Sequence, residues 1–218
     1  MTKKDFWLSL VIGGLVGILL QPLISNFSAD ISGLAVIPLI EFRVMAFFLF
    51  LFGAPLALFV FFVLSRFIAV LYPHTKVFGV GVYQFAKFAC VGVLNTSVDL
   101  GIFNLATFLY GSLPVASVFA MFKAVSFLTA TTNSFIWNKY WTFGANSKPQ
   151  AGEIFKFYTI AIIGGFLNVG VATAVRTANF SFVSPNTLVN FVAPICGILA
   201  VFLWNFIGYK YVVFKKFD

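Results

Sequence analysis

Asp99 and Lys123 are the residues whose types and spacing most directly suggest chemistry, because both lie inside long apolar stretches. A charged side chain at membrane depth is costly, and it is usually paired or faces a cavity. Asp99 lies eleven residues before Tyr110, and Lys123 lies nine residues after Pro114. If the two stretches are antiparallel helices joined by a short outer turn, both charges lie roughly 14–16 Å from the outer ends. We therefore predict that Asp99 and Lys123 meet near the middle of the membrane.

Two interpretations of this charge pair stay open at the level of sequence. The pair pins two helices together, or it faces an anionic substrate or a proton. Buried ion pairs add little net stability, so stability alone does not account for the pair. Asn95 lies four residues before Asp99 and shares its helix face. Asn133 lies in the same apolar stretch as Lys123, and Asn168, Asn190 and Asn205 recur at similar depths further along the chain. Hydrogen bonds between helices would explain any one of them, but Asn95, Asp99, Lys123 and Asn133 together predict a polar seam.

Four lysines lie at the expected inner ends of the apolar stretches, each beside aromatic residues: Lys87, Lys139, Lys156 and Lys210. Ammonium groups gathered at the level of the lipid headgroups could bind a phosphate or pyrophosphate. Lysines on the inner side and a belt of aromatic residues are also common in membrane proteins. We interpret the aromatic residues as such a belt and keep both interpretations of the lysines.

The residues needed for several other chemistries are missing from the sequence. Cys90 and Cys196 lie inside apolar stretches without metal-ligand spacing, and His74 is the single histidine. The sequence has no catalytic triad pattern, no zinc-binding spacing and no glycine-rich phosphate loop. We therefore expect no enzyme activity, no metal and no cofactor.

The elements that position these residues follow from composition. Apolar residues make up 61% of the chain and charged residues 9%, whereas soluble domains are about 25% charged. Runs of about 20 apolar residues can each cross the bilayer as a helix. We expect an all-α membrane protein with six such spans, near residues 7–25, 44–71, 88–110, 115–137, 157–176 and 188–209. In the first span, Gly13-x-x-x-Gly17 is typical of close helix packing.

The distribution of basic residues predicts the orientation. If both termini are cytoplasmic, eleven of the 14 basic residues lie inside, two lie outside and Lys123 lies within the membrane. This is a strong positive-inside pattern, and the net charge of +8 then reflects topology and affinity for anionic membrane lipids. The lysines are spread over separate short loops, so we expect no nucleic-acid binding.

The second half of the chain contains an internal repeat. Residues 85–143 and 155–214 each begin with a Lys-Phe pair, form two apolar stretches and end in an aromatic segment with a lysine. Each copy is long enough for a hairpin of two spanning helices. Because each hairpin would start and end inside, the copies share one orientation, as in parallel-repeat transporters. We expect a two-helix hairpin in residues 1–80, followed by a four-helix core of two repeated hairpins in residues 81–218.

The repeat resembles the GtrA-like family of small membrane proteins. Residues 84–99 contain Gly-x-x-Asn-x-x-x-Asp, and residues 133–143 end in Asn-Lys-x-Trp-Thr-Phe. The resemblance covers about 130 residues, as judged from the repeat boundaries. It implies functional roles in the first copy for Asn95, Asp99, Asn133, Asn138, Lys139 and Trp141, and in the second for Asn168, Asn205 and Lys210.

The resemblance also implies a function. Family members are four-helix proteins thought to move polyprenyl-phosphate-linked sugars across the cytoplasmic membrane, often beside a glycosyltransferase. We expect this activity, with the phosphate on the inner lysines and the sugar in the polar seam, and a homodimer is plausible. An alternative is an accessory subunit that stabilises a polyprenyl-phosphate glycosyltransferase and moves nothing. A third is a proton-driven exporter that uses Asp99.

Overall fold

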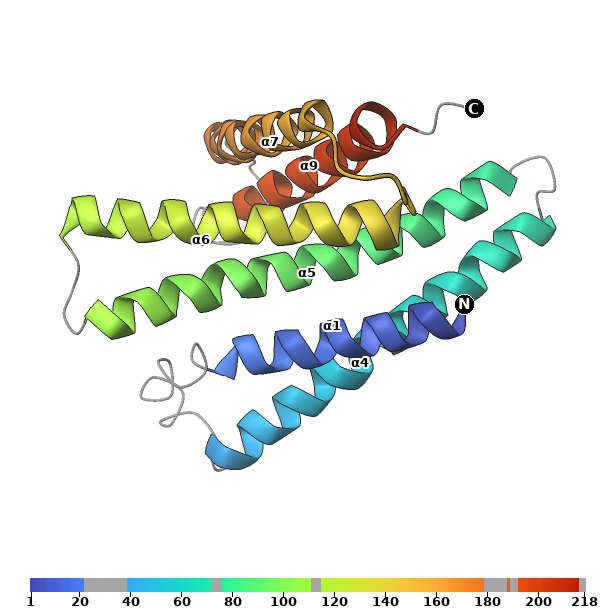
Figure 1. Ribbon diagram of the computed structural model, residues 1–218, viewed down its shortest axis with the longest axis horizontal. Helices are drawn as coiled ribbons and strands as arrows, with labels where there is room; N and C mark the ends of the chain where they lie inside the picture. The colour runs from blue at the N-terminus through green and yellow to red at the C-terminus, as the bar shows by residue number, and fades with distance from the viewer. Residues whose placement is uncertain (22–38, 72–75, 111–114, 179–187, 189–191, 216–218) are drawn as a thin grey trace. The chain divides into compact units, whose positions relative to one another are not determined.

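The structure is a computed structural model that describes residues 1–21, 39–71, 76–110, 115–178, 188 and 192–215 (Figure 1). The predicted all-α fold is confirmed, because these residues form six α-helices and no strand. The α-helices are α1 (Lys3–Leu19), α4 (Leu39–Leu71), α5 (Lys76–Tyr110), α6 (Ala116–Trp137), α7 (Ala151–Thr177) and α9 (Ala193–Gly208). Two short π-helical segments continue α6 and α9, namely η2 (Asn138–Thr142) and η4 (Tyr209–Val213).

Four of the described helices are long and apolar enough to cross a membrane: residues 42–71, 80–110, 151–177 and 193–213. They support the membrane class of the protein. The two other predicted spans are less apolar or shorter in the structure. α1 has 17 residues, and α6 carries Lys123, Asn133 and six Ser or Thr residues among its 22. The arrangement with six spans therefore stays a prediction.

Helix ends differ from the predicted spans mainly where a helix continues past its apolar run. α5 begins twelve residues before the span expected at 88–110, and α7 begins six residues before the one expected at 157–176. Polar and cap residues support such extensions, as Glu153 does in the first turn of α7. Residues 22–25, the predicted end of the first span, lie outside the described residues.

The chain divides into two compact units, Met1–Thr142 and Phe143–Asp218. In the first, α1 packs on α4 and α5, and α5 also packs on α4 and α6. A β-carbon at Gly13 would lie 2.2 Å from the carbonyl oxygen of Phe50, and one at Gly17 would lie 2.8 Å from Phe47. The two glycines thus allow close contact with α4, as their spacing predicts. A domain boundary near residue 80 stays a sequence-based prediction.

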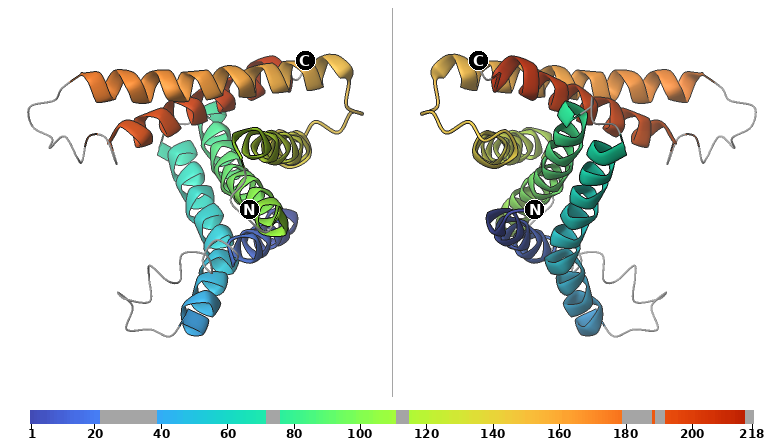
Figure 2. Two further views of the ribbon diagram at one scale, coloured as in Figure 1. Left: turned by 90° about the vertical axis from the view of Figure 1, so that its left-hand side faces the viewer. Right: turned by 90° about the vertical axis from the view of Figure 1, so that its right-hand side faces the viewer.

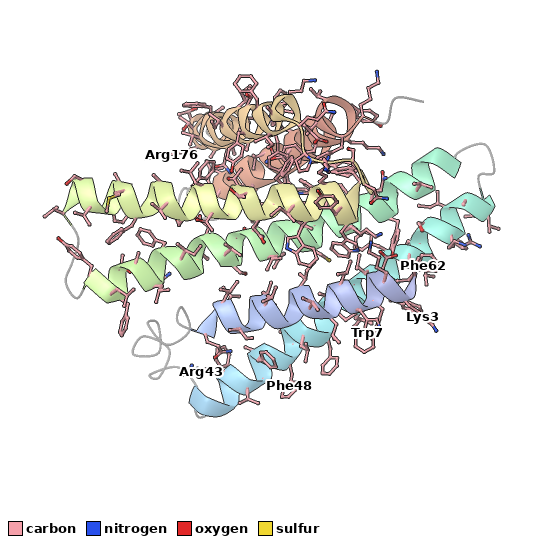
Figure 3. All side chains as sticks on the ribbon, in the orientation of Figure 1. Lys3, Trp7, Arg43, Phe48, Phe62 and Arg176 are labelled. Atoms are coloured by element: carbon pink, nitrogen blue, oxygen red, sulfur yellow. The ribbon has the colours of Figure 1, made fainter. Side chains whose placement is uncertain are left out.

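The core of the first unit is formed by apolar residues from α1, α4 and α5 with Trp141 of η2, namely Ile12, Val16, Leu58, Ala86, Val91, Leu94 and Trp141. Many large apolar side chains instead point away from the protein. Trp7 on α1 is 62% exposed and Phe48 on α4 is 49% exposed (Figure 3). Such side chains are suited to contact with lipid tails, in keeping with the membrane class.

In the second unit, α7 and α9 lie side by side and antiparallel (Figure 2). A β-carbon at Gly164 would lie 2.7 Å from the side-chain oxygen of Asn205, and one at Gly197 would lie 2.7 Å from the backbone oxygen of Asn168. The Trp204 indole N–H donates to the backbone oxygen of Ile160 at 3.1 Å. Small residues thus bring these two helices into close contact.

The sequence repeat has a counterpart in the structure. Each copy consists of two helices, of which the second ends in a five-residue π-helical segment. The lysine is the second residue of each segment, Lys139 in η2 and Lys210 in η4. π-Helical segments are rare and frequently found at functional sites. The two copies thus place a lysine within a π-helical segment at the same end of each hairpin.

Candidate functional site

The Asp99 carboxylate on α5 pairs with Lys123 on α6, as the sequence predicts. Lys123 Nζ lies 2.5 Å from Asp99 Oδ2, and the Ser126 hydroxyl donates to Asp99 Oδ1 at 2.6 Å. Ser126 is fully buried. It follows Lys123 by three residues and so lies on the same face of α6. Both oxygens of the carboxylate therefore have a donor on α6.

The pair is not sealed inside the protein. The Lys123 side chain is 48% exposed and the Asp99 side chain 24%. Lys123 Nζ also lies 5.7 Å from the centre of the Phe103 ring, which is within the range of a cation–π contact. An ammonium group at membrane depth is costly when it meets lipid alone. The uncovered part of Lys123 is thus suited to water, a ligand or another protein surface.

Several predicted site asparagines have buried polar atoms that lack a hydrogen-bond partner within the described part of the chain. These atoms are Asn95 Oδ1, Asn133 Nδ2, Asn138 Oδ1 and Asn205 Oδ1. A buried polar group without a partner costs about 1–3 kcal/mol, and the bilayer core supplies no water to satisfy it. The atoms of the first unit, Asn95 Oδ1, Asn133 Nδ2 and Asn138 Oδ1, include both acceptors and a donor, which are the groups that bind hydroxyl groups.

Asn138 and Asn168 have further contacts within the protein. Asn138, besides its unpaired oxygen, donates through Nδ2 to the backbone oxygen of Ser134 at 2.9 Å and to its hydroxyl at 3.1 Å. Asn168 lies against Gly197 of α9. Its location fits helix packing, the interpretation that sequence alone kept open for any single asparagine.

The four predicted phosphate-binding lysines have different environments. Lys139 is fully buried, with Nζ 5.9 Å from the centre of the Tyr140 ring. Lys210 is half-buried and lies 5.6 Å from the ring centre of Phe206 and 5.5 Å from that of Tyr211. Lys156 is exposed. Lys87 is paired with a carboxylate that sequence reasoning did not identify.

That carboxylate belongs to Asp5, in the first turn of α1. Lys87 Nζ lies 2.5 Å from Asp5 Oδ1, and the Trp141 indole N–H donates to the same oxygen at 3.0 Å. Lys87 Nζ also lies 4.9 Å from the centre of the Tyr83 ring. Asp5 is 96% buried, since its exposed fraction is 4%. Lys87 and Trp141, both from the first copy of the repeat, thus contact a side chain from the N-terminal hairpin.

Local sequence places Asp5 at this point. Thr2 caps α1, and its hydroxyl accepts from the backbone N–H of Asp5 at 3.1 Å. In return, Asp5 Oδ2 accepts from the Thr2 hydroxyl at 2.8 Å and from its backbone N–H at 3.2 Å. This reciprocal capping box is visible in the sequence as Thr-x-x-Asp before an apolar run. That pattern could have located Asp5 at a helix start, but not beside Lys87.

The ionisation of Asp5 follows from these contacts. Burial by itself would raise the pKa of Asp5, but the hydrogen bonds from Lys87 and Thr2 and the charge of Lys87 outweigh it. The pKa of Asp5, which precedes the expected first span, is therefore held well below its ordinary value. Asp5 carries a negative charge at neutral pH.

These observations define a class: a helical membrane protein in which a repeated two-helix hairpin carries buried asparagines and lysines in π-helical segments, with an ion pair between α5 and α6 in the first copy. Residues 87–214 match the family model described as "GtrA/DPMS, transmembrane domain". The match covers more than half of the chain, and the protein belongs to this family. Asp5 and the rest of α1 and α4 precede the matched region.

One curated relative has a similar sequence. The chain is 27% identical over 128 residues to the uncharacterized membrane protein YngA of Bacillus subtilis (strain 168), a match that covers 59% of this chain and 77% of that protein. No solved structure matches.

Proposed function

We propose that this protein translocates a polyprenyl-phosphate-linked sugar across the cytoplasmic membrane, for cell-surface polysaccharide synthesis or glycosylation. Family membership supports a role in the handling of such lipids. The observation that carries the proposal is that the first hairpin holds both the Asp99–Lys123 pair and buried amide atoms of Asn95 and Asn133 without hydrogen-bond partners among the described residues. A sugar offers hydroxyl groups, each of which can donate and accept hydrogen bonds.

The sugar would bind along the first hairpin. Asn95 Oδ1 is an acceptor and Asn133 Nδ2 is a donor, and sugar hydroxyl groups can donate to the first and accept from the second. Asn95 lies one helical turn from Asp99, on the same face of α5. A sugar at Asn95 could therefore reach the exposed part of the Asp99–Lys123 pair. Hydrogen bonds to these groups would replace those that the sugar loses on leaving water.

The phosphate and the polyprenyl tail would use other parts of the protein. The phosphate would bind at the inner lysines, of which Lys87, Lys156 and Lys210 are not fully buried, since a lysine ammonium group binds phosphate as a point charge. The tail would stay in lipid along the apolar exposed faces. Translocation forms and breaks no covalent bond, so the proposal needs no catalytic residue and no cofactor.

The second candidate is the accessory subunit that stabilises a polyprenyl-phosphate glycosyltransferase. The half-exposed Lys123 favours this candidate, because a partner protein that covers the side chain would keep its charge away from lipid. In that case the unpaired amide atoms are satisfied by the partner, and the purified protein moves no lipid.

Transport by purified protein in proteoliposomes tests the proposal, with a fluorescent short-chain polyprenyl-phosphate-linked sugar as the substrate. Asn95→Leu removes an unpaired buried oxygen at similar volume, so we expect unchanged or higher thermal stability together with reduced transport. Asn104→Leu is the matched control on the same helix, because the Asn104 amide already donates to the backbone oxygen of Leu100 at 2.8 Å.

The accessory candidate predicts a different result. Wild-type protein alone would then give no transport above empty liposomes. If wild-type protein does transport the lipid and Asn95→Leu transports it at the wild-type rate, the amide seam is not the sugar path.

A further inference from the structure

Two donors of the family-matched region converge on one oxygen of Asp5. Lys87 Nζ and Trp141 Nε1 lie 2.5 and 3.0 Å from Asp5 Oδ1. The other oxygen, Oδ2, accepts hydrogen bonds from Thr2 of the same helix. The carboxylate thus has one oxygen held by α1 itself and one held by α5 and η2.

The Lys87 and Trp141 donors suit a phosphate as well as a carboxylate. An ammonium group and an indole N–H can both donate to one anionic oxygen, and such charge-assisted bonds are the strong ones. The Tyr83 and Trp141 rings lie 4.9 and 5.6 Å from Lys87 Nζ, so they hold the ammonium group in place. Trp141 itself is 5% exposed. These side chains form an anion-binding site in which the lysine is held in position by its neighbours, unlike a lysine on an open surface.

The anion in this site comes from outside the matched region. Lys87 and Trp141 lie within residues 87–214, whereas Asp5 lies in the N-terminal hairpin that precedes them. The second copy provides a comparison. Lys156, the counterpart of Lys87, is exposed, and Glu153, the third residue of α7, accepts from the backbone N–H of Gln150 in its own first turn. Asp5 is likewise the third residue of its helix, but it also reaches across to α5 and η2.

We propose that Lys87 and Trp141 form a phosphate-binding site that Asp5 occupies when no ligand is bound, so that α1 competes with the phosphate group. This rests on the proposed function, because the phosphate meant is that of the polyprenyl lipid at the inner surface. On phosphate binding, Asp5 leaves and the anionic oxygen of the phosphate takes the two donors. The rest of α1 stays packed, because Ile12, Gly13 and Val16 hold it on its neighbours. Only the first turn needs to move.

The test measures binding of farnesyl phosphate to the purified full-length protein in detergent. Asp5→Asn removes the competing charge while it keeps the shape of the side chain. We expect Asp5→Asn to bind farnesyl phosphate at least about tenfold more tightly, the effect of one freed charge-assisted hydrogen bond. Lys87→Gln in the Asp5→Asn background should abolish this gain. Glu153→Gln is the matched control: it removes a carboxylate from the same position of another helix, and its affinity should equal that of the wild type.

Two further probes identify the source of the phosphate. Farnesol has the tail without the phosphate, and inorganic phosphate has no tail. A gain in Asp5→Asn for farnesyl phosphate alone assigns the site to the lipid. An equal gain for inorganic phosphate assigns it to free phosphate, which overturns the assignment to the lipid. If folded Asp5→Asn protein binds farnesyl phosphate as the wild type does, or more weakly, then Asp5 only holds α1 in place and the proposed competition is wrong.

Hydrogen exchange on the wild-type protein gives an independent readout that needs no variant. Farnesyl phosphate should increase exchange at the start of α1, because it displaces Asp5, and leave exchange around residues 12–16 unchanged. Binding with no change at the start of α1 overturns the competition while the proposed function stands. No binding of farnesyl phosphate to either the wild type or Asp5→Asn overturns both.

Discussion

Replacing Asp99 by Asn tests the ion pair between Asp99 and Lys123 directly. The carboxylate accepts from Lys123 at 2.5 Å and from Ser126 at 2.6 Å. Asn keeps the shape, so the main loss is the counterion of Lys123. Breaking a fully buried ion pair costs about 3–5 kcal/mol, and one hydrogen bond to a charged group contributes about 1.5–3 kcal/mol. Because Lys123 is 48% exposed, solvation of its unpaired charge would offset part of the cost. We therefore expect the free energy of unfolding to fall by about 2–3 kcal/mol, less than for a fully buried pair.

The expected loss is measurable by thermal unfolding. For a chain of about this length, 1 kcal/mol corresponds to a shift in Tm of about 2–4 °C. Asp99→Asn should therefore lower Tm by about 4–12 °C. The double variant Asp99→Asn, Lys123→Gln removes both charges and should recover most of this loss, since no charge is then left unpaired.

Transport by the double variant separates the two interpretations of the pair. Recovered stability without transport places the pair in the translocation path, as we expect. Recovery of both stability and transport means that the pair only holds α5 and α6 together. An unchanged Tm in Asp99→Asn would contradict this prediction, because the contact between Asp99 and Lys123 would then contribute nothing to the stability of the fold.

Two other predictions concern packing and topology. Gly13→Ala should lower Tm or prevent folding, because its β-carbon would lie 2.2 Å from the backbone oxygen of Phe50; Gly14→Ala is the matched control, since its nearest neighbour is a Leu51 side-chain carbon at 3.5 Å. Equal Tm values would show that α1 and α4 are not in close contact. For topology, a protein without its two native cysteines receives one new cysteine, and an impermeant thiol reagent is added to intact cells. We expect no labelling at Ser147, and its labelling would reverse the inside assignment of that loop. We expect labelling at three outer positions, which lie outside the described residues: Ser32, Ser112 and Ser181.

Sequence alone determined the class of protein, the helices and one contact of the site. Apolar runs of sufficient length define spanning helices because the bilayer core must be crossed with every backbone group satisfied. The Asp99–Lys123 contact could be predicted because the two residues lie on consecutive helices at equal distances from one connection, and the helical rise is constant. The repeat could also be found in the sequence, since both copies have a lysine at the same position near the end of their second helix.

The tertiary structure decided which polar side chains are paired, buried or accessible. Asp5 and Trp141 are 136 positions apart in sequence, and their contact depends on how α1 packs against α5 and η2. In the same way, Lys139 is fully buried while its repeat counterpart Lys210 is only half-buried. Helical periodicity describes one helix at a time, whereas the burial of a side chain depends on neighbours that are distant in sequence. The residue types therefore predicted candidates for a phosphate site, and packing determined that one of them, Lys87, already holds an anion.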